Sequence, residues 1–131
     1  MTDIILSIHP KWAQKIYSGK KIFEVRKTAP GLFRANHDCI IYLYETSPIK
    51  KITGFVFLDW VRREIFLGKG LISPRLINGS CLSEEELIKY SSGKDLYFWD
   101  LKDPFKFDTP QDIKGSVPQS WRYLKKGERY D

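Results

Sequence analysis

The feature that most constrains the fold of this chain is the short connection between its two longest apolar stretches. Cys39–Glu45 (CIIYLYE) and Ile52–Phe66 (ITGFVFLDWVRREIF) are rich in the β-branched and aromatic residues that favour strands. The six residues that separate them, TSPIKK, can form a hairpin turn but are too few for a helical crossover. The two stretches are therefore expected to pair antiparallel, which argues against a doubly wound parallel sheet.

The N-terminal part of the chain predicts a strand, a helix and a second strand. Ile4–Ile8 is a short apolar strand, and Pro10 suits the first position of a helix, where its missing N–H costs nothing. Gly19 ends that helix, and the next strand starts directly after it. Within the later hairpin, Gly54 indicates a bulge or a close approach of two backbones.

The C-terminal half is expected to add one more helix and one or two strands. The segment Gly68–Gly79 is polar and is expected to be irregular, and Ser83 with Glu86 then forms the capping box that starts a helix. The stretch DLYFWDLKDPFKFD predicts one strand, or two divided at Pro104. The last residues of the tail PQSWRYLKKGERYD are expected to fray.

The order of these elements predicts an α+β fold, a mixed β-barrel of five to six strands flanked by two or more helices. The 131 residues are expected to form a single domain, residues 1–131, because no linker, internal repeat or low-complexity segment divides them. The formal net charge is +6, and the first 34 residues hold seven Lys or Arg against Asp3 and Glu24. A basic surface of this kind attracts polyanions such as nucleic acid, although solubility alone explains it equally well.

The sparse cysteines and histidines predict neither a metal site nor a cofactor. Cys39, Cys81, His9 and His37 lack the spacing of metal ligands, and the two thiols form no Cys-x-x-Cys pair. The start MTDIILSI has no basic segment ahead of its short apolar run, and no run approaches the roughly 20 apolar residues of a membrane span. The chain is therefore expected to be cytoplasmic.

The segment SGKKIFEVRK places charges on a strand that could have left its polar face neutral. By strand alternation Glu24 and Arg26 share one face and Phe23 and Val25 the other, while Lys21 lies at the start of the strand. An exposed ion pair on an edge strand, worth roughly 0–1 kcal/mol, is the structural explanation. The functional explanation is a charged site, and the residues alone leave both open.

Two further segments are candidates for ligand binding. YETSP ends a strand in a hydroxyl-rich turn whose backbone N–H groups can face an anion. PQSWRYL offers an amide for a base edge, aromatic rings for stacking and a guanidinium for phosphate, although Trp121 could equally be a core residue. The candidate binding residues are Lys21, Glu24, Arg26, Tyr44, Thr46, Ser47, Gln119, Ser120, Trp121 and Arg122.

In order and spacing, four segments of this chain resemble the ASCH domains, which are relatives of the PUA domain. The resemblance spans nearly the whole chain, and its most specific parts are the pattern xPxxAxKIxSGxKxxExR and a distant PQSxRYL. It implies a PUA-like barrel with a cleft whose wall carries Lys21, Glu24 and Arg26. The four segments are ILSIHPKWAQKIYSGKKIFEVRK, IIYLYETSPIKKITGFVFL, LIKYSSGKDLYFWDL and PQSWRYL.

The resemblance implies that the cleft binds single-stranded RNA or a modified nucleoside, which would fit a regulatory role in RNA metabolism. Glu24 would accept a hydrogen bond from a base amino group, and Lys21 and Arg26 would face phosphate or a polarised carbonyl. A DNA or protein partner for the basic face is a third hypothesis, and no membrane partner is expected.

The resemblance leaves open whether the chain is an enzyme. Some similar small members are amidohydrolases that deacetylate acetylcytidine with a lysine matching Lys21, a threonine at position 24 and a glutamate before the second helix. This chain has Glu24 instead of that threonine, and its NGSC segment has no carboxylate, so only Glu24 itself, or less readily Glu84 or Glu85, could serve as the base. Other members are reported as ribonucleases. The alternative function is therefore a small hydrolase, acting on an acylated nucleoside or on RNA, with Lys21 and Glu24 as catalytic residues.

Overall fold

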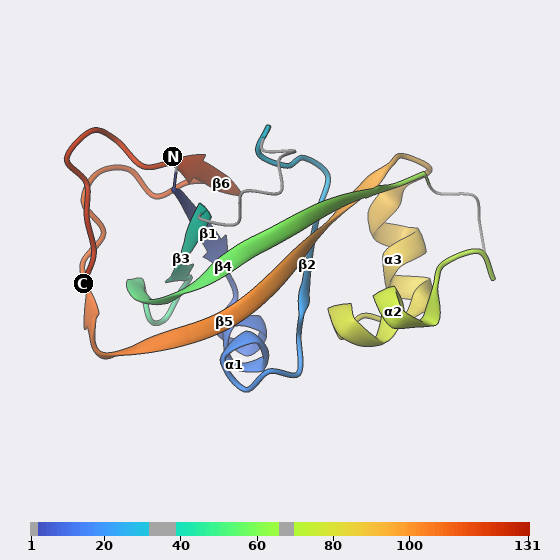
Figure 1. Ribbon diagram of the computed structural model, residues 1–131, viewed down its shortest axis with the longest axis horizontal. Helices are drawn as coiled ribbons and strands as arrows, with labels where there is room; N and C mark the ends of the chain where they lie inside the picture. The colour runs from blue at the N-terminus through green and yellow to red at the C-terminus, as the bar shows by residue number, and fades with distance from the viewer. Residues whose placement is uncertain (1–2, 32–38, 66–69) are drawn as a thin grey trace.

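The computed structural model in Figure 1 describes residues 3–31, 39–65 and 70–131. Six strands and three helices follow one another within these residues, and the predicted hairpin of two long strands is confirmed. In chain order the elements are β1 (Ile4–Ile8), α1 (Pro10–Tyr17), β2 (Phe23–Arg26), β3 (Cys39–Glu45), β4 (Lys51–Glu64), α2 (Pro74–Ser80), α3 (Glu84–Ser91), β5 (Leu96–Gln111) and β6 (Trp121–Tyr123).

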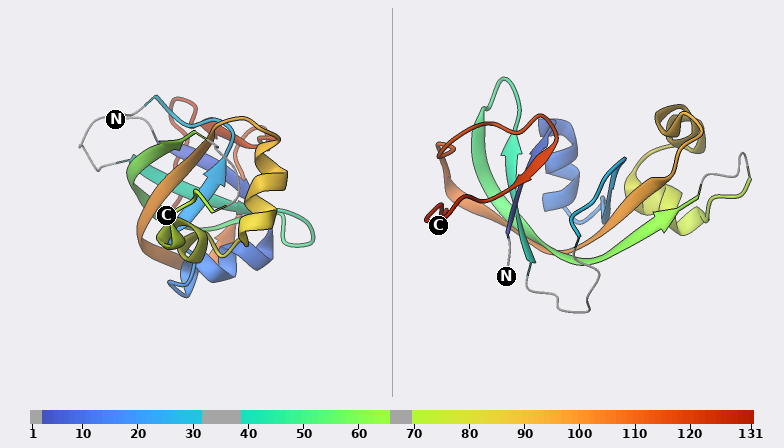
Figure 2. Two further views of the ribbon diagram at one scale, coloured as in Figure 1. Left: turned by 90° about the vertical axis from the view of Figure 1, so that its right-hand side faces the viewer. Right: turned by 90° about the horizontal axis from the view of Figure 1, so that it is seen from above.

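The strands form one mixed sheet in the order β2-β5-β4-β3-β1-β6. Only β1 and β3 pair parallel, and the other neighbours are antiparallel. The long strands β4 and β5 curve strongly, so the sheet curls into a half-barrel with α1 on its concave side (Figure 2). The α+β, PUA-like barrel fold predicted from the sequence is confirmed.

Gly54 shows how the curvature is achieved. The register of β4 against β5 shifts between Ile52 and Gly54, as expected for a bulge that bends a strand. A Cβ atom at Gly54 would lie 2.2 Å from the carbonyl oxygen of Phe105, so no other residue fits without moving the backbone. Both alternatives predicted for this glycine, a bulge and a close backbone approach, are present.

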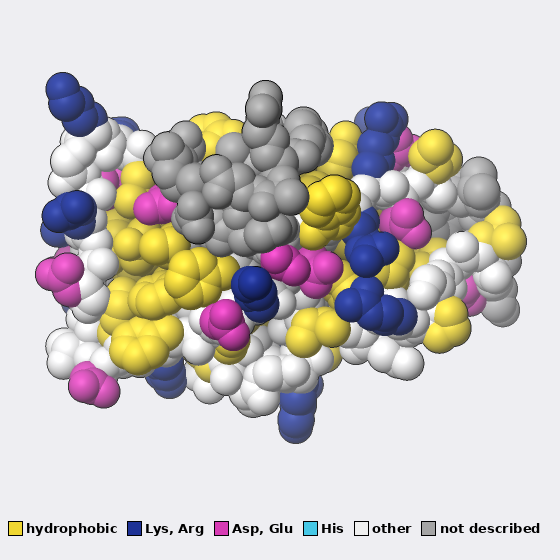
Figure 3. Space-filling model, in the orientation of Figure 1, with side chains coloured by type: hydrophobic (Ala, Val, Ile, Leu, Met, Phe, Trp, Pro, Cys, Tyr) yellow, Lys and Arg dark blue, Asp and Glu magenta, His cyan; other side chains and the backbone are white. Residues whose placement is uncertain are grey.

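Apolar side chains pack in three clusters. The inner cluster fills the concave side and includes Ile16 of α1, and a second cluster joins Phe23 of β2 to α2 and α3. The outer cluster packs Tyr42, Phe107 and neighbouring aromatic rings on the convex face. Figure 3 shows hydrophobic side chains gathered over the part of β4 and β5 where this outer cluster lies. Among the described residues no helix is long and apolar enough to span a bilayer.

Side chains, not backbone pairing, connect the two edge strands of the sheet. Arg26 on β2 donates from Nη2 to the carbonyl oxygen of Ser7 at 2.8 Å and from Nη1 to Oγ of Ser120 at 3.0 Å. Trp121 on β6 donates from Nε1 to Oγ1 of Thr28 at 3.0 Å. These bonds draw the β2 edge towards β1 and β6 and bring the segment before β6 next to the charged strand.

Two local expectations are corrected by the structure, and it decides between two alternatives at a third place. The segment expected to be irregular contains α2, which Ser73 caps by accepting a hydrogen bond from the Arg75 N–H at 3.2 Å. Of the two alternatives predicted around Pro104, the single strand is confirmed: β5 runs through this proline, which is accommodated where the register against β4 shifts and Asp103 adopts a positive φ of 53°. The tail does not fray, since Glu128 and Tyr130 are buried, and the capping box predicted for α3 is confirmed.

Candidate functional site

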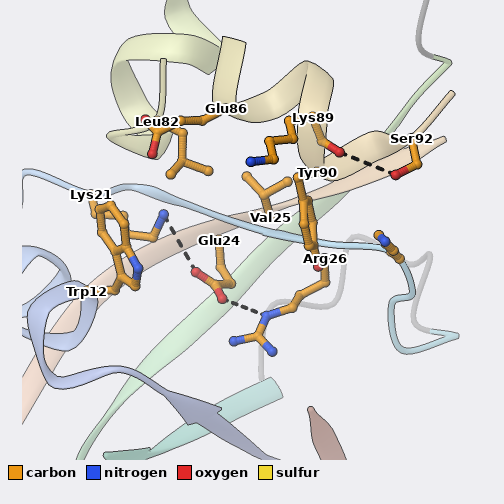
Figure 4. A pocket seen from close by; sticks show the side chains of 11 residues that line it. Trp12, Lys21, Glu24, Val25, Arg26, Leu82, Glu86, Lys89, Tyr90 and Ser92 are labelled. Atoms are coloured by element: carbon orange, nitrogen blue, oxygen red, sulfur yellow. Dashed lines mark hydrogen bonds and ion pairs between the residues drawn. The ribbon is translucent and has the colours of Figure 1, made fainter. Parts of the chain in front are cut away.

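A cleft of about 720 Å³ lies between β2 and α3, at the end of α1 (Figure 4). It contains the three charged residues that the sequence singled out, together with charged and aromatic side chains from both helices. Four basic and two acidic side chains line it, which makes it electropositive. Its lining residues are Trp12, Lys21, Glu24, Val25, Arg26, Lys27, Leu82, Glu86, Lys89, Tyr90 and Ser92.

Lys21 lies at the base of the cleft with only 2% of its surface exposed. The turn that ends α1 directs it there, because its backbone N–H bonds to the Lys15 carbonyl after Gly19 adopts a φ of 84°. Its Nζ donates to the carbonyl oxygen of Ser80 at 2.5 Å and lies 3.6 Å from Oε1 of Glu24. Burial lowers the pKa of this ammonium group below its ordinary value, and the nearby Glu24 carboxylate only partly opposes that shift.

Glu24 lies between two cations and is itself 5% exposed. Oε1 faces Nζ of Lys21, and Oε2 accepts a hydrogen bond from Nε of Arg26 at 2.7 Å. Charge-assisted bonds of this length fix the orientation of a carboxylate. The acid is therefore held rigidly at the floor of the cleft, with lone pairs left on both oxygens.

Arg26 is positioned mainly as a structural anchor. Nε, Nη1 and Nη2 each donate to a different segment, namely Glu24, Ser120 and the backbone of Ser7. In Figure 4 its guanidinium points away from α3. Three of the five N–H donors of this group are thus bound within the described residues, and two are left for a ligand.

The opposite wall of the cleft comes from α3, and the sequence patterns did not assign it. Glu86, Lys89 and Tyr90 are spaced three and four residues apart, which places them on one side of a helix. Nζ of Lys27 lies 4.9 Å from the centre of the Tyr90 ring, and Nζ of Lys21 lies 5.0 Å from that of Trp12. The helical spacing could have indicated this face, but Trp12 carried no signal beyond the apolar side of α1.

The other candidate residues are not brought into the cleft. Oγ of Ser120 accepts a hydrogen bond from Arg26 but does not line the cleft. Trp121 packs edge-on against Trp99, with 5.8 Å between ring centres. The rest lie elsewhere: Tyr44 is buried in the outer cluster, Thr46 and Ser47 lie in the β3–β4 turn, Gln119 is exposed, and Arg122 pairs with Glu128 at 2.8 Å. Their part in ligand binding remains a prediction.

Metal binding finds no support in the described part of the chain. No three His, Cys, Asp or Glu side chains there lie close enough together to hold a metal ion. The polar groups at the base of the cleft are two cations and the carboxylate bound to them. The cleft can therefore bind a ligand through hydrogen bonds and charge, and through stacking on its aromatic rings.

Comparison with known proteins matches this chain to a family model and to proteins of Zymomonas mobilis. A model of the ASCH domain matches residues 6–110. The ASCH domain-containing ribonuclease of Zymomonas mobilis subsp. mobilis is 28% identical over 98% of this chain and 92% of its own length.

Solved structures agree with that match. The crystal structure of ASCH from Zymomonas mobilis has a TM-score of 0.77 and 25% identity, covering 95% of this chain and 88% of that one. A serine-to-alanine mutant of the Zymomonas mobilis protein has a TM-score of 0.78 and 25% identity, over 95% and 89% of the two chains.

Proposed function

This chain belongs to the ASCH domain family, and we propose that it binds single-stranded RNA and takes one nucleotide into the cleft beside β2. The relative named as a ribonuclease supports RNA as the ligand, because the likeness covers nearly the full length of both chains. An unpaired nucleotide fits better than a duplex, since a base must leave its stack to enter a cleft of this size.

The observation that carries the proposal is the placement of Lys21 and Glu24 at the floor of an open cleft. Removing two such charges from water costs several kcal/mol per ion. The packing of the fold alone does not require buried charges at these positions. Nζ of Lys21 has three N–H donors, of which one is bound to Ser80 and one faces Glu24. The third donor and the free lone pairs of Glu24 are available to the polar atoms of a nucleotide.

The walls supply the remaining contacts that a nucleotide needs. Trp12 and Tyr90 offer aromatic faces on which a base can stack, a contact worth about 1–3 kcal/mol. Lys27 and Lys89 are exposed at the rim, where they can neutralise phosphate groups on either side of the bound base.

Salt dependence of binding tests the proposal. We would measure the Kd of a fluorescent 12-nucleotide single-stranded RNA between 50 and 300 mM salt for the wild type and a Lys27→Gln/Lys89→Gln variant. If both lysines contact phosphate, the slope of log Kd against log salt falls by about 1.4, at roughly 0.7 per phosphate of a single strand.

A matched variant controls for net charge. Lys125 and Lys126 are also exposed and belong to the basic tail, outside the cleft. Lys125→Gln/Lys126→Gln changes the charge equally and should leave the slope unaltered. A reduced slope in the tail variant together with an unchanged slope in the cleft variant would place the RNA on the tail and refute the proposal.

RNA cleavage is a second candidate function, favoured by the name of the relative and by the lowered pKa of Lys21 beside Glu24. When a 2′-hydroxyl attacks the neighbouring phosphorus, one group accepts its proton and another donates a proton to the leaving 5′-oxygen. Glu24 would accept and Lys21 would donate, while the ammonium charge stabilises the phosphorane.

Lys21→Met separates cleavage from binding, because methionine keeps most of the side-chain volume without the charge. We expect end-labelled RNA to be cut by the wild type and left intact by the variant, with cyclic phosphate at the new ends. Equal cutting by both proteins would identify a contaminating nuclease, and intact RNA with both would leave binding as the function.

A further inference from the structure

β2 is an edge strand, and its register with β5 decides which of its backbone groups are already used. Among the described strands it pairs only with β5, where Glu24 lies opposite Trp99 and Val25 opposite Phe98. The backbone N–H of Leu101 donates to the carbonyl of Ile22 at 2.9 Å, so Ile22 belongs to a hydrogen-bonded pair. Such pairs alternate along an antiparallel ladder, so the backbone of Glu24 faces β5 and that of Val25 faces the free edge.

The free edge of β2 opens into the cleft. Val25 is one of its lining residues, and Figure 4 shows β2 running between the α3 side chains above and Glu24 below. Apart from the strand ladders, no hydrogen bond among the described residues involves the Val25 backbone. An edge strand normally has such groups covered or blunted, whereas here they face an electropositive hollow.

The residue two positions along the same edge lies against the cleft wall. Nζ of Lys27 lies 4.9 Å from the centre of the Tyr90 ring. Burial raises the pKa of the Tyr90 phenol, and the Arg26 charge and the Lys27 backbone partly oppose that shift. Val25 itself presents a backbone donor with a carbonyl acceptor beside it.

We propose that the backbone N–H and C=O of Val25 read the hydrogen-bonding edge of the nucleobase that enters the cleft, an inference that rests on the proposed function. The N–H and C=O of one extended residue point to the same side, and each RNA base carries a donor next to an acceptor on its Watson–Crick edge. Such a pair makes two bonds to a base without any side chain.

A base fits this edge better than an added peptide strand. β2 has four residues, and an added strand needs several consecutive free groups along an edge. Lys27, which directly follows β2, already lies against Tyr90, with Nζ 4.9 Å from the centre of the ring. The aromatic rings of Trp12 and Tyr90 lie on the two sides of the Val25 edge, where they can hold a planar ligand.

A proline at position 25 tests the backbone donor directly. The one backbone group that Val25→Pro removes is an N–H that the β5 ladder does not use, and proline is tolerated at such edge positions. Val25→Ala is the matched control, because it also loses the buried valine side chain but keeps the N–H. We expect Val25→Pro to bind the 12-nucleotide RNA about tenfold more weakly than Val25→Ala, with thermal melts confirming that both are folded.

A base modification tests the same contact without altering the protein. Wild-type protein is titrated with U12 and with its N3-methyluridine counterpart, and with A12 and its N6,N6-dimethyladenosine counterpart. Methylation blocks the Watson–Crick edge but leaves the phosphates and the ring faces, so we expect at least a tenfold loss of affinity for the homopolymer that binds more tightly.

The outcomes distinguish this inference from the proposed function. Equal binding of methylated and unmethylated RNA, or of the Pro and Ala variants, overturns the reading of the base edge and leaves RNA binding intact. Failure of every RNA to bind the wild type overturns both. If Val25→Pro does not fold, the methylated RNAs decide, and saturation of the site by a short extended peptide would instead assign the edge to strand addition.

Discussion

Two networks of buried charge, one in the C-terminal tail and one in the cleft beside β2, differ in how completely their groups are bound. In the tail, Glu128 accepts from both Nη atoms of Arg122, from the Lys125 N–H at 2.9 Å and from the Tyr130 hydroxyl. In the cleft, Glu24 accepts one short bond from Arg26 and faces Lys21 at 3.6 Å. A saturated network stabilises the fold, and an unsaturated one beside a cleft keeps capacity for a ligand.

The same comparison shows how fully Arg122, one of the predicted ligand-binding residues, is bound within the protein. Arg122 also donates to the carbonyl oxygens of Ser116, Tyr123 and Lys114. Its guanidinium therefore joins the tail to itself, and all of its described bonds are internal. Arg122 is in this respect a structural residue, whereas Lys27 and Lys89 keep their charges at the rim of the cleft.

The largest expected effect comes from breaking the saturated network. Glu128→Gln should lower the free energy of unfolding by about 3 kcal/mol, because either orientation of the amide turns its NH₂ towards donors that the carboxylate accepted. Urea unfolding measures the loss. Asp112→Asn, at the exposed pair with Lys51, is the control and should cost less than about 1 kcal/mol. RNA affinity should not change, and a tenfold loss would show that the two networks are coupled.

The matched change in the cleft, Glu24→Gln, should weaken RNA binding and should cost less stability than Glu128→Gln. Glu24→Gln can still accept from Arg26, while Lys21 keeps its bond to Ser80, so we expect a smaller loss of stability, about 1–2 kcal/mol. RNA binding should weaken about tenfold, because a ligand loses the anionic acceptor between two cations. Parallel losses in melting temperature and affinity would contradict the comparison and make Glu24 a structural residue.

The smallest expected effect is a pH dependence confined to the tail network. The bonds from Arg122, Lys125 and Tyr130 outweigh burial and hold the pKa of Glu128 at about 2, below its ordinary 4.5. Stability from this carboxylate is complete above the ordinary pKa and is lost as the pH falls towards 2. The difference in unfolding free energy between wild type and Glu128→Gln should therefore shrink between pH 6 and pH 3. A constant difference would show that these bonds do not lower the pKa of Glu128.

Much of the fold could be predicted because its signals are local. A six-residue connection dictated the β3–β4 hairpin, Ser83 with Glu86 marked the start of α3, and Gly54 marked the bulge. β6 was missed for the opposite reason, because it has only three residues and its pairing with β1 makes it a strand. The short α2 did carry a local signal, Ser73 as the cap followed by Pro74 at the first helical position, and the prediction did not use it.

The candidate site was predictable on one wall only. Strand alternation placed Glu24 and Arg26 on a common face, and the structure has them bonded. The α3 wall lies some sixty residues further along the chain, and its approach to β2 depends on tertiary packing that no local pattern encodes. For the same reason the inward direction of Arg26, towards Ser7 and Ser120, could not be read from the sequence.

The anchoring of Arg26 has a consequence for which substitutions position 26 can accept. One planar group spans a carboxylate, a hydroxyl and a main-chain oxygen on three separate segments. A lysine carries its charge at a single point and cannot reach three fixed acceptors that diverge in this way. The fold therefore requires a guanidinium at this position whether or not a ligand binds. Even the conservative exchange of Arg26 for lysine would break bonds that connect β2 to β1 and to the segment before β6.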